Sequence, residues 1–460
     1  MVWLILILAL FLRLINIDQS LWWDEAINVV YAGSADFWWF VTKYPVGDFH
    51  PPGWFALLWV WGNLFGFSES VVRLPSVILG IATIGLTYLL GKEMFSKKVG
   101  LLAATILAVA PLHVYYSQEA RMYVLAAFSV TLSFYFLNRL LLKKRWAGLG
   151  FMISLILIVY SDYLAYLIIP TQLIYLYSVK QLNRKNLKFF LAPLLAIIPW
   201  LLVFPTQLKT GINTAAELPG WSNVVGSTFT DLILIPVKTF FGRVSLLDKN
   251  LYAGISILTA SIYGMIFLQG LKKLDQSTRL LIAWIVIPVG GAFLFSFFVP
   301  VLAYFRVIFI LPAVYLLLAK AIDSLPKKLA LPSFLAVCLI SLLSLGAYYL
   351  NPAFQRENWR EAVNFVSQNA DGKSLVIFEN NEIPAPVKYY AKNLSNFKAG
   401  LSPDLEVSLS TKTRVFLFEY LVDIYDPKRE VEQKLQALDF ASFKTYDFSG
   451  VGFIRIYVKK

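Results

Sequence analysis

Residues 71–90 read VVRLPSVILGIATIGLTYLL, an almost unbroken run of apolar side chains. A helix needs about 20 apolar residues to cross the hydrocarbon core of a bilayer. Basic residues follow this run closely, at Lys92, Lys97 and Lys98. Because loops rich in Lys and Arg stay on the cytoplasmic side, the stretch predicts a membrane-spanning helix whose C-terminal end faces the cytoplasm.

The composition of the whole chain agrees with this reading. Of its 460 residues 58% are hydrophobic, and the mean hydropathy is +0.65, which excludes a soluble globular protein. The net charge is +13 at pH 7, but residues 351–460 hold 15 Lys and Arg against 14 Asp and Glu. The positive excess therefore lies in short loops between apolar runs. It indicates membrane orientation rather than binding of nucleic acid.

Five basic clusters separate the apolar runs and set the predicted orientation. Placing all five in the cytoplasm leaves one consistent path of about eleven spans, with the N-terminus inside and the C-terminus outside. The run from Pro52 to Phe67 is then no span; it is short, rich in Trp and expected to lie along the interface. The predicted spans lie near residues 1–16, 71–90, 99–113, 122–142, 147–162, 163–179, 189–205, 251–270, 280–299, 304–322 and 330–350. The clusters are Lys92/Lys97/Lys98, Lys143/Lys144/Arg145, Lys180/Arg184/Lys185/Lys188, Lys272/Lys273/Arg279 and Lys320/Lys327/Lys328.

The fold class that follows is a mainly α polytopic protein of the cell membrane with a small extracytoplasmic α/β domain. Residues 1–350 form the membrane part, with a long outer loop at 17–70. A second outer loop at 206–250 contains Pro219-Gly220 and a mildly amphipathic stretch over 224–241, and is a candidate lid.

Residues 351–460 show the patterns of a separate α/β domain. Trp359 to Val366 follow helical periodicity. Strands are predicted at Ser374–Phe378 and Arg414–Phe418, and a charged helix at Lys428–Leu438. A hairpin around Ser449-Gly450 joins residues 440–447 to 453–459.

The predicted topology gathers polar residues from distant parts of the chain on the outer face. The first of them, Asp24 and Glu25, follow two tryptophans in Leu21-Trp22-Trp23-Asp24-Glu25-Ala26. Ionisable groups near a membrane are costly and usually functional, and the cytoplasmic loops hold no such mixture. The outer face is therefore the predicted site, formed by Asp24, Glu25, His50, Arg73, Glu119, Arg121, Asp162 and Arg306.

Each of these residues also has a simpler structural interpretation. The two neighbouring carboxylates suit the first turn of a helix, where negative charge favours the helix dipole. A basic residue at a helix end commonly extends toward lipid headgroups. The simpler roles are a helix start for Asp24 and Glu25, headgroup contact for Arg73 and Arg306, a local ion pair for Glu119 and Arg121, and a helix cap or helix end for His50 and Asp162.

Four short motifs add a family resemblance. They are His50-Pro51-Pro52-Gly53, Val72-Arg73-Leu74-Pro75-Ser76, LLGKEMF at 89–95 and PLHVYYSQEARMY at 111–123. In this order, and with Asp24-Glu25 in the first outer loop, they strongly resemble the protein O-mannosyltransferase-like glycosyltransferases. That group comprises glycosyltransferase family 39 and its bacterial relatives, with the GT-C membrane fold. The agreement covers roughly residues 10–180.

The resemblance implies transfer of a sugar from a polyprenyl-phosphate carrier on the outer face, as in the aminoarabinose transferases of lipid A. By matching positions, Asp24 is the expected catalytic base and Glu25 its companion. His50 lies where relatives place a group near the donor phosphate, Glu119 matches an acidic residue of the second outer loop, and Arg306 resembles a basic residue near the lipid phosphate. The protein-modifying relatives usually carry a lumenal domain between spans, whereas the extra domain here is C-terminal. The acceptor therefore stays open between a glycolipid, a polysaccharide and a protein.

The chemistry of such a transfer suits these side chains. A sugar phosphate already has a good leaving group, so the enzyme must deprotonate the acceptor hydroxyl, a step in which one base contributes about 10²–10⁴-fold. Arg306, Arg73 or protonated His50 would stabilise the departing phosphate, and Arg121 and Asp162 are further candidates for substrate binding. A single displacement would invert the anomeric centre. Asp24, Glu25 and Glu119 could also hold a divalent cation, although no spacing between them requires it.

Two other functions are compatible with a polytopic protein. A transporter or lipid flippase would carry polar groups near the middle of the membrane and broken helices in two related halves, and the sequence shows neither. A sensor built on the C-terminal domain would not need about eleven spans for anchoring.

Overall fold

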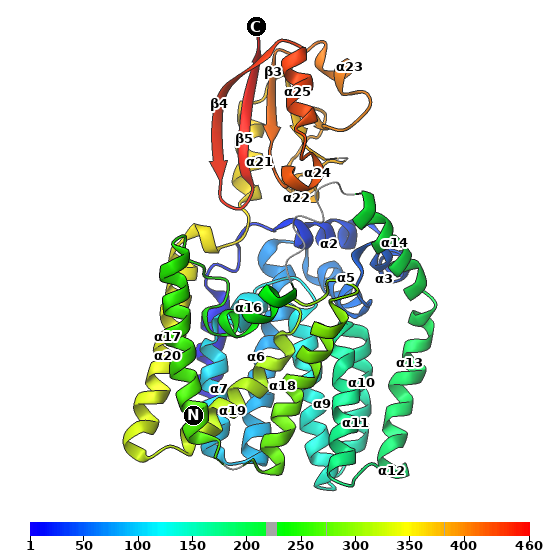
Figure 1. Ribbon diagram of the computed structural model, residues 1–460. Coiled ribbons are helices and arrows are strands. Elements are labelled where there is room, and N and C mark those ends of the chain that lie inside the picture. Colours follow the sequence, from blue (N-terminus) through cyan, green and yellow to red (C-terminus); the bar gives the residue numbers. More distant parts are fainter. Residues whose placement is uncertain (218–227, 273, 381) are drawn as a thin grey trace.

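The computed structural model describes residues 1–217, 228–272, 274–380 and 382–460. A bundle of helices carries a small α/β domain at one end (Figure 1). The helices of the bundle are α1 (Val2–Leu14), α6 (Glu69–Met94), α7 (Lys97–Val109), α9 (Tyr123–Leu141), α10 (Ala147–Ser161), α11 (Ile168–Ser178), α13 (Leu191–Leu201), α17 (Lys249–Gly270), α18 (Gln276–Phe295), α19 (Leu311–Asp323) and α20 (Lys327–Leu350).

Each predicted span coincides with a helix or a bent pair of helices. Within the described ranges, α6, α9, α17, α18 and α20 are each long and apolar enough to cross a membrane alone. Two bent pairs raise this number to seven: α7 with α8 (Pro111–Ser117), at 63°, and residues 184–201 with 204–213, at 53°. The other four predicted spans are the shorter helical segments α1, α10, residues 164–178 and α19. The predicted polytopic helical class is confirmed.

The basic turns lie together at the end of the bundle that is remote from the sheet (Figure 1). Lys98 Nζ lies 2.7 Å from Asp323 Oδ1, which joins the turn between α6 and α7 to the end of α19. Lys320 pairs with Asp275, the residue that caps the start of α18. These contacts place the predicted cytoplasmic loops on one face.

The first outer loop folds into four short helices between the bundle and the sheet domain. They are α2 (Trp23–Ser34), α3 (Phe37–Thr42), α4 (Pro45–Asp48) and α5 (Gly53–Phe65). α5 has 13 residues, as many as α1 and α19, so its length alone does not distinguish it from the predicted spans. It packs against α2, α3 and α6. That residues 52–67 do not form a span stays a prediction.

The second outer loop contributes α14 (Phe204–Glu217) and α16 (Thr228–Phe241). In Figure 1, α16 crosses the end of the bundle nearest the sheet domain, and it packs on α8. The hydroxyl of Tyr315 in α19 donates to the Thr239 carbonyl at 2.9 Å. Pro219-Gly220 and the first part of the predicted amphipathic stretch lie outside the described residues.

The C-terminal domain is built on a five-stranded sheet of order β2-β1-β3-β5-β4. Strands β1 (Ser374–Phe378), β2 (Phe397–Ala399) and β3 (Arg414–Phe418) are parallel, and β4 (Phe440–Phe448) and β5 (Gly452–Lys459) form the antiparallel hairpin. β1 is buried along its whole length, as expected of a strand covered on both faces. The remaining helices include α21 (Trp359–Asn369), α22 (Ala385–Tyr390), α23 (Leu405–Leu409), α24 (Val422–Tyr425) and α25 (Glu430–Ala437).

Candidate active site

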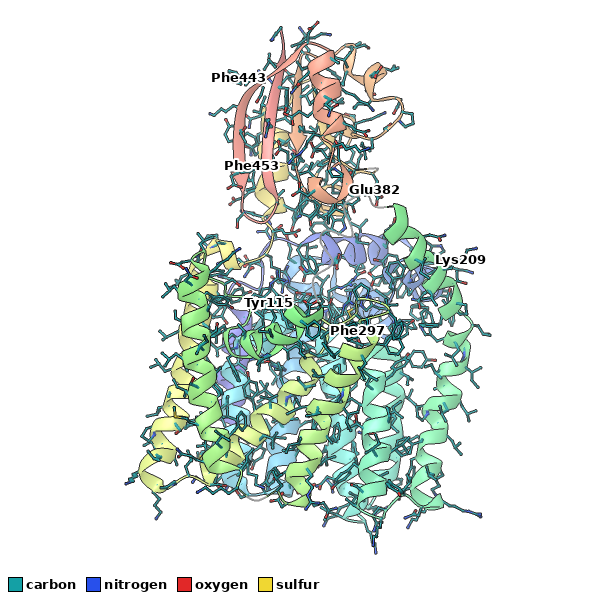
Figure 2. All side chains as sticks on the ribbon, in the orientation of Figure 1. Tyr115, Lys209, Phe297, Glu382, Phe443 and Phe453 are labelled. Carbon is teal, nitrogen blue, oxygen red and sulfur yellow. The ribbon has the colours of Figure 1, made fainter. Side chains whose placement is uncertain are left out.

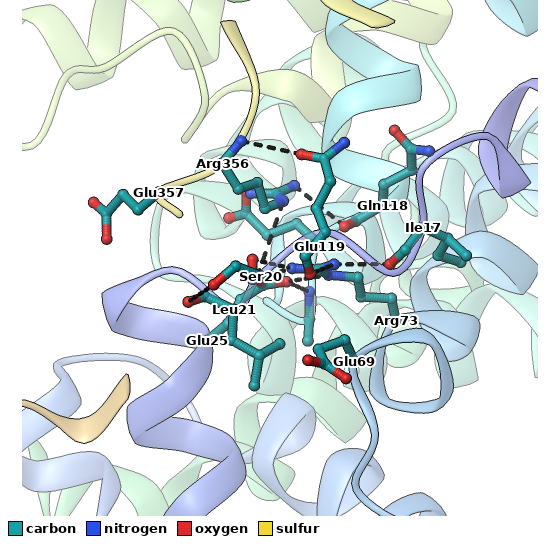
Figure 3. A network of polar contacts seen from close by, with 12 residues as sticks. Ile17, Ser20, Leu21, Glu25, Glu69, Arg73, Gln118, Glu119, Arg356 and Glu357 are labelled. Carbon is teal, nitrogen blue, oxygen red and sulfur yellow. Dashed lines mark hydrogen bonds and ion pairs between the residues drawn. The ribbon is translucent and has the colours of Figure 1, made fainter. Parts of the chain in front are cut away.

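Glu25 and Arg73 form a buried ion pair that holds the first outer loop on the bundle (Figure 3). Arg73 Nε and Nη2 donate to the two Glu25 carboxylate oxygens at 2.9 and 2.5 Å, and the Ala120 backbone N–H donates to Oε1 at 2.7 Å. The other Arg73 N–H groups donate to carbonyls within residues 17–20. All five donors of the guanidinium are thereby used. The geometry favours an anchoring role for Arg73 over phosphate binding.

Arg356, which follows α20, neutralises Glu119 in a second buried pair. Its Nη1 donates to Glu119 Oε2 at 2.6 Å, and its guanidinium carbon lies 4.3 Å from the centroid of the Tyr115 ring. Burial raises the pKa of Glu119, although Arg356 opposes the rise. Arg356 Nε also lies 4.0 Å from Glu25 Oε2. We call Glu25, Arg73, Glu119 and Arg356 the closed cluster, because every member has a charged partner and is almost fully buried.

Asp48, His50 and Arg121 form a second group at the end of α4. Phe49 adopts a left-handed φ of 64°, which turns the chain so that His50 Nδ1 lies 2.7 Å from Asp48 Oδ1. Arg121 Nη1 and Nη2 donate to the Asp48 carboxylate at 2.8 and 3.3 Å. Burial opposes ionisation here, but Arg121 and His50 outweigh it and lower the pKa of Asp48 to about 2. Asp48 is therefore the ionised counter-charge of Arg121.

Asp24 is the most open of the paired acidic side chains in these groups. Its side chain is 39% exposed, against 0% for Glu25 and 10% for Asp48. Arg121 Nη2 lies 3.6 Å from its Oδ2, beyond hydrogen-bonding distance. Despite the opening, the surrounding protein desolvates the carboxylate and raises the pKa of Asp24, while Arg121 opposes the rise. We call Asp24, Asp48, His50 and Arg121 the open cluster.

Two arginines lie near the clusters, and no ion pair among the described residues involves them. Arg306 Nη1 donates to the carbonyls of residues 300 and 301 at 3.5 and 3.2 Å. Its positive charge partly opposes the rise in the pKa of Asp24. Arg243, two residues after the end of α16, has its guanidinium carbon 5.2 Å from the centroid of the Tyr115 ring. Tyr115 lies at the end of the bundle nearest the sheet domain (Figure 2). Both guanidinium groups have donors left for an anionic ligand.

Asp162 joins neither cluster. It closes α10, and its Oδ1 accepts a hydrogen bond from the Leu164 backbone at 2.8 Å. The following residue, Tyr163, hydrogen-bonds to Gln207, whose amide donates to the Pro45 carbonyl at 2.6 Å. Asp162 thus ends α10 and accepts a hydrogen bond from the first residue of the short helix at 164–167, which agrees with its simpler interpretation.

An apolar cavity of about 530 Å³ lies between α3, α5, α10 and α13. Its lining includes Trp38, Pro52, Tyr160 and Trp200. None of the candidate polar residues lines it, although Pro52 follows His50 closely in the chain. Its chemistry suits a hydrocarbon chain rather than the reacting groups.

Three charged residues of this region, Asp48, Arg243 and Arg356, were not predicted from the sequence. Asp48 is an acidic residue two positions before His50, and this spacing within the first outer loop was an available signal. Arg243 and Arg356 lie beyond the stretch that carries the family motifs. Only the packing of α16 and of the chain after α20 brings them to Tyr115.

The acidic residues do not converge as metal ligands would. In the part of the chain that the structure describes, no group of three or more His, Cys, Asp or Glu side chains is arranged to hold a metal ion. Glu25 and Glu119 instead accept hydrogen bonds from Arg73 and Arg356.

The helical bundle, the short helices of the loop at 17–70 and the polar clusters beneath the sheet domain define a multi-pass membrane protein with a candidate site at the end of the bundle that carries this domain. Residues 49–206 match the family described as dolichyl-phosphate-mannose-protein mannosyltransferase. This match confirms the resemblance that the four motifs indicated. No curated protein matches the sequence.

Solved structures share the fold. ArnT from Cupriavidus metallidurans in the apo state is 12% identical, with a TM-score of 0.62, and the match covers 99% of this chain and 97% of ArnT. The same protein bound to undecaprenyl phosphate is 12% identical, with a TM-score of 0.61 and the same coverage. The Archaeoglobus fulgidus oligosaccharyltransferase in complex with Zn and sulfate is 14% identical, with a TM-score of 0.56, over 100% of this chain and 73% of that one. The comparisons confirm that the chain shares the GT-C fold of these structures.

Proposed function

We propose that this protein transfers a sugar from a polyprenyl-phosphate donor to an acceptor hydroxyl on the outer face of the membrane. The observation that carries the proposal is the contrast of Asp24 with its neighbours: a partly exposed carboxylate with a raised pKa beside Arg121 and near Arg306. The family match over residues 49–206 and the structure of ArnT bound to undecaprenyl phosphate support the donor class.

In the proposed reaction Asp24 removes the proton from the acceptor hydroxyl. The acceptor oxygen then bonds to the anomeric carbon of the sugar as the bond from that carbon to the phosphate oxygen breaks. The electron pair of the broken bond leaves with the polyprenyl phosphate, and the single displacement inverts the anomeric centre. A carboxylate whose pKa is raised by burial is a stronger base than an ordinary aspartate.

Arg306 and Arg243 are the proposed contacts of the leaving phosphate. Both lie at the outer end of the bundle, and no carboxylate of the described residues pairs with them. Charge-assisted hydrogen bonds from guanidinium groups stabilise the negative charge that develops there. His50 and Arg121 border the acceptor side, with Asp48 holding both in place. Glu25, Arg73 and Glu119 keep the surrounding backbone fixed. Asp162 ends α10 and has no contact with the substrate in this proposal.

The apolar cavity beside α5 and α13 fits a hydrocarbon chain of one of the lipid-borne substrates. Its lining of Trp38, Pro52, Tyr160 and Trp200 offers contact area and few polar groups. The sugar is a hexose or a pentose, and the acceptor a glycolipid, a polysaccharide or a protein.

The protein is proposed to lie in the plasma membrane. In the proposed orientation the sheet domain lies outside the cell and the basic turns lie in the cytoplasm. The test introduces single cysteines at positions 146 and 373 in a chain whose Cys338 has been replaced by Ala. A membrane-impermeant thiol reagent added to sealed cells should label position 373 only. Labelling of both positions from outside would contradict the topology.

The direct test of function incubates the purified protein with a panel of labelled polyprenyl-phosphate sugars and candidate acceptors. Transfer of one label, abolished in Asp24→Asn, is the expected result. A wild-type protein that moves intact lipid across a vesicle membrane, without cleaving any donor, would instead identify a flippase.

A further inference from the structure

The sheet domain contacts the helix that carries Asp24 at its first turn. Glu357, between α20 and α21, accepts hydrogen bonds at Oε2 from the Trp23 backbone N–H, at 3.1 Å, and from Trp359 Nε1, at 2.7 Å. Its Oε1 accepts from the Tyr420 hydroxyl at 3.0 Å. Because the first N–H groups of a helix lack partners within it, Glu357 serves as a cap for α2 that another domain supplies.

Aromatic packing fixes the same residue from the side. The Trp23 ring stacks on Tyr420 with 5.2 Å between centroids and 17° between planes, and it lies 6.2 Å from Trp359. Trp359 is fully buried, and Tyr420 lies two residues after the end of β3. Trp23 is thus packed against the hydrophobic core of the sheet domain, although it belongs to the first outer loop.

The residue after Asp24 is fixed by the bundle. Glu25 accepts hydrogen bonds from Arg73 in α6 and from the Ala120 backbone. The Asp24 carboxylate therefore stands between two immobilised neighbours, one held by the sheet domain and one by the bundle. Its own side chain has only the 3.6 Å contact with Arg121 among the ion pairs of the described residues.

We infer that the sheet domain positions the base: Glu357, with Tyr420 and Trp359, holds Trp23 and thereby fixes the direction of the Asp24 carboxylate. This rests on the proposed function, in which Asp24 takes the acceptor proton. Glu357 is a positioning residue, since it reaches the reaction only through the backbone of Trp23. In this proposal the C-terminal domain contributes to the active site, because its residues position the helix turn that carries Asp24.

The test compares Glu357→Ala with Glu357→Gln in the full-length protein. Gln keeps all three contacts, because its carbonyl oxygen accepts from both Trp23 and Trp359 while its amide donates to the Tyr420 hydroxyl. Burial raises the pKa of Glu357 to about 7, so near neutral pH Gln resembles a form that the native residue already adopts. Ala removes all three contacts. Glu406→Gln, an exposed residue of the same domain, is the matched control.

We expect Glu357→Ala to lower kcat about tenfold to a hundredfold, since a small misplacement of a reacting group has effects of this size. KM for the lipid donor should stay within twofold of wild type, because the proposed phosphate contacts lie on other elements. Glu357→Gln should restore most of kcat, and Glu406→Gln should match wild type. Wild-type kcat in Glu357→Ala, or equal losses in Ala and Gln, would overturn the inference.

A second readout does not depend on activity. Amide hydrogen exchange over residues 20–34 should accelerate in Glu357→Ala and remain at the wild-type rate in Glu357→Gln. Unchanged exchange in both variants would overturn the positioning role. If Asp24→Asn retains full transfer while hydrogen exchange in the Glu357 variants responds as expected, Asp24 is not the base but Glu357 still fixes the start of α2. The proposed function and the positioning role can therefore fail separately.

Discussion

The closed and open clusters begin at two consecutive residues, Glu25 and Asp24, and still have opposite characters. Glu25 is fully buried and bonded to Arg73, whereas Asp24 is 39% exposed and lies 3.6 Å from Arg121. Consecutive residues of a helix point about 100° apart, so α2 directs the Glu25 carboxylate into the bundle and leaves the Asp24 carboxylate partly exposed. Two identical charges in sequence thus become an anchor and a candidate base through orientation alone.

The energetics of the two clusters differ for the same reason. Removing one partner of a buried ion pair strongly lowers the free energy of unfolding, because the other charge stays buried without compensation. A partly exposed carboxylate is solvated on its open side, so changing it costs little stability. The closed cluster should therefore respond to substitution through folding, and the open cluster through catalysis.

The largest effect is expected from breaking the closed cluster. Arg73→Ala leaves the Glu25 carboxylate buried without its main partner, which should destabilise the protein by about 3–5 kcal/mol. The measurement is thermal unfolding of the purified protein in detergent. The double variant Arg73→Met with Glu25→Leu should lose less than Arg73→Ala, because no charge stays behind. An unchanged unfolding temperature in Arg73→Ala would show that the pair is not an anchor.

The open cluster should show the reverse behaviour. Asp24→Asn keeps the size of the side chain and removes its ability to take a proton, so transfer should fall about 10²-fold or more with the unfolding temperature retained. Rates measured with Mg²⁺, with Mn²⁺ and with EDTA separate loss of a base from loss of a metal ligand. A fully active, folded Asp24→Asn enzyme would remove Asp24 from the mechanism.

A smaller effect is expected at the proposed phosphate contact. Arg306→Ala should raise KM for the lipid donor about tenfold, the usual contribution of a hydrogen bond to a charged group. Arg306→Lys should lose less, because Lys keeps the charge without the guanidinium geometry. Lys209→Ala serves as the control, since Lys209 is an exposed cation of α14 (Figure 2). Equal KM values in all variants would show that Arg306 only contacts headgroups.

The smallest effect concerns pH. Burial raises the pKa of Asp24, and a base works only when deprotonated, so kcat/KM should fall on acidification at a pH above the ordinary aspartate value of about 3.9. Arg306 opposes the rise, and its removal in Arg306→Ala should move this acid limb to still higher pH. A shift toward lower pH would contradict the proposed proximity of Arg306 to the base.

The sequence predicted most of the bundle because membrane spans leave a strong local signal. An apolar run such as residues 71–90 and a basic turn after it are readable without any long-range contact, since the bilayer imposes the same length and polarity on each helix. The strands at 374–378 and 414–418 were likewise predicted from short apolar runs. Strand β2 was not predicted, because its three residues carry too little pattern.

The sequence by itself determined the helical membrane class, the family resemblance and the list of outer-face polar residues. Only the tertiary structure decided which of these pair with one another. The partners of Glu25 and Glu119 are Arg73 and Arg356, 48 and 237 positions away, and no local periodicity encodes contacts over such distances. The exposure of Asp24 and the cap from Glu357 follow in the same way from the packing of three separate elements around one helix turn. Burial and charge pairing are properties of the assembled fold, and they separate a base from an anchor.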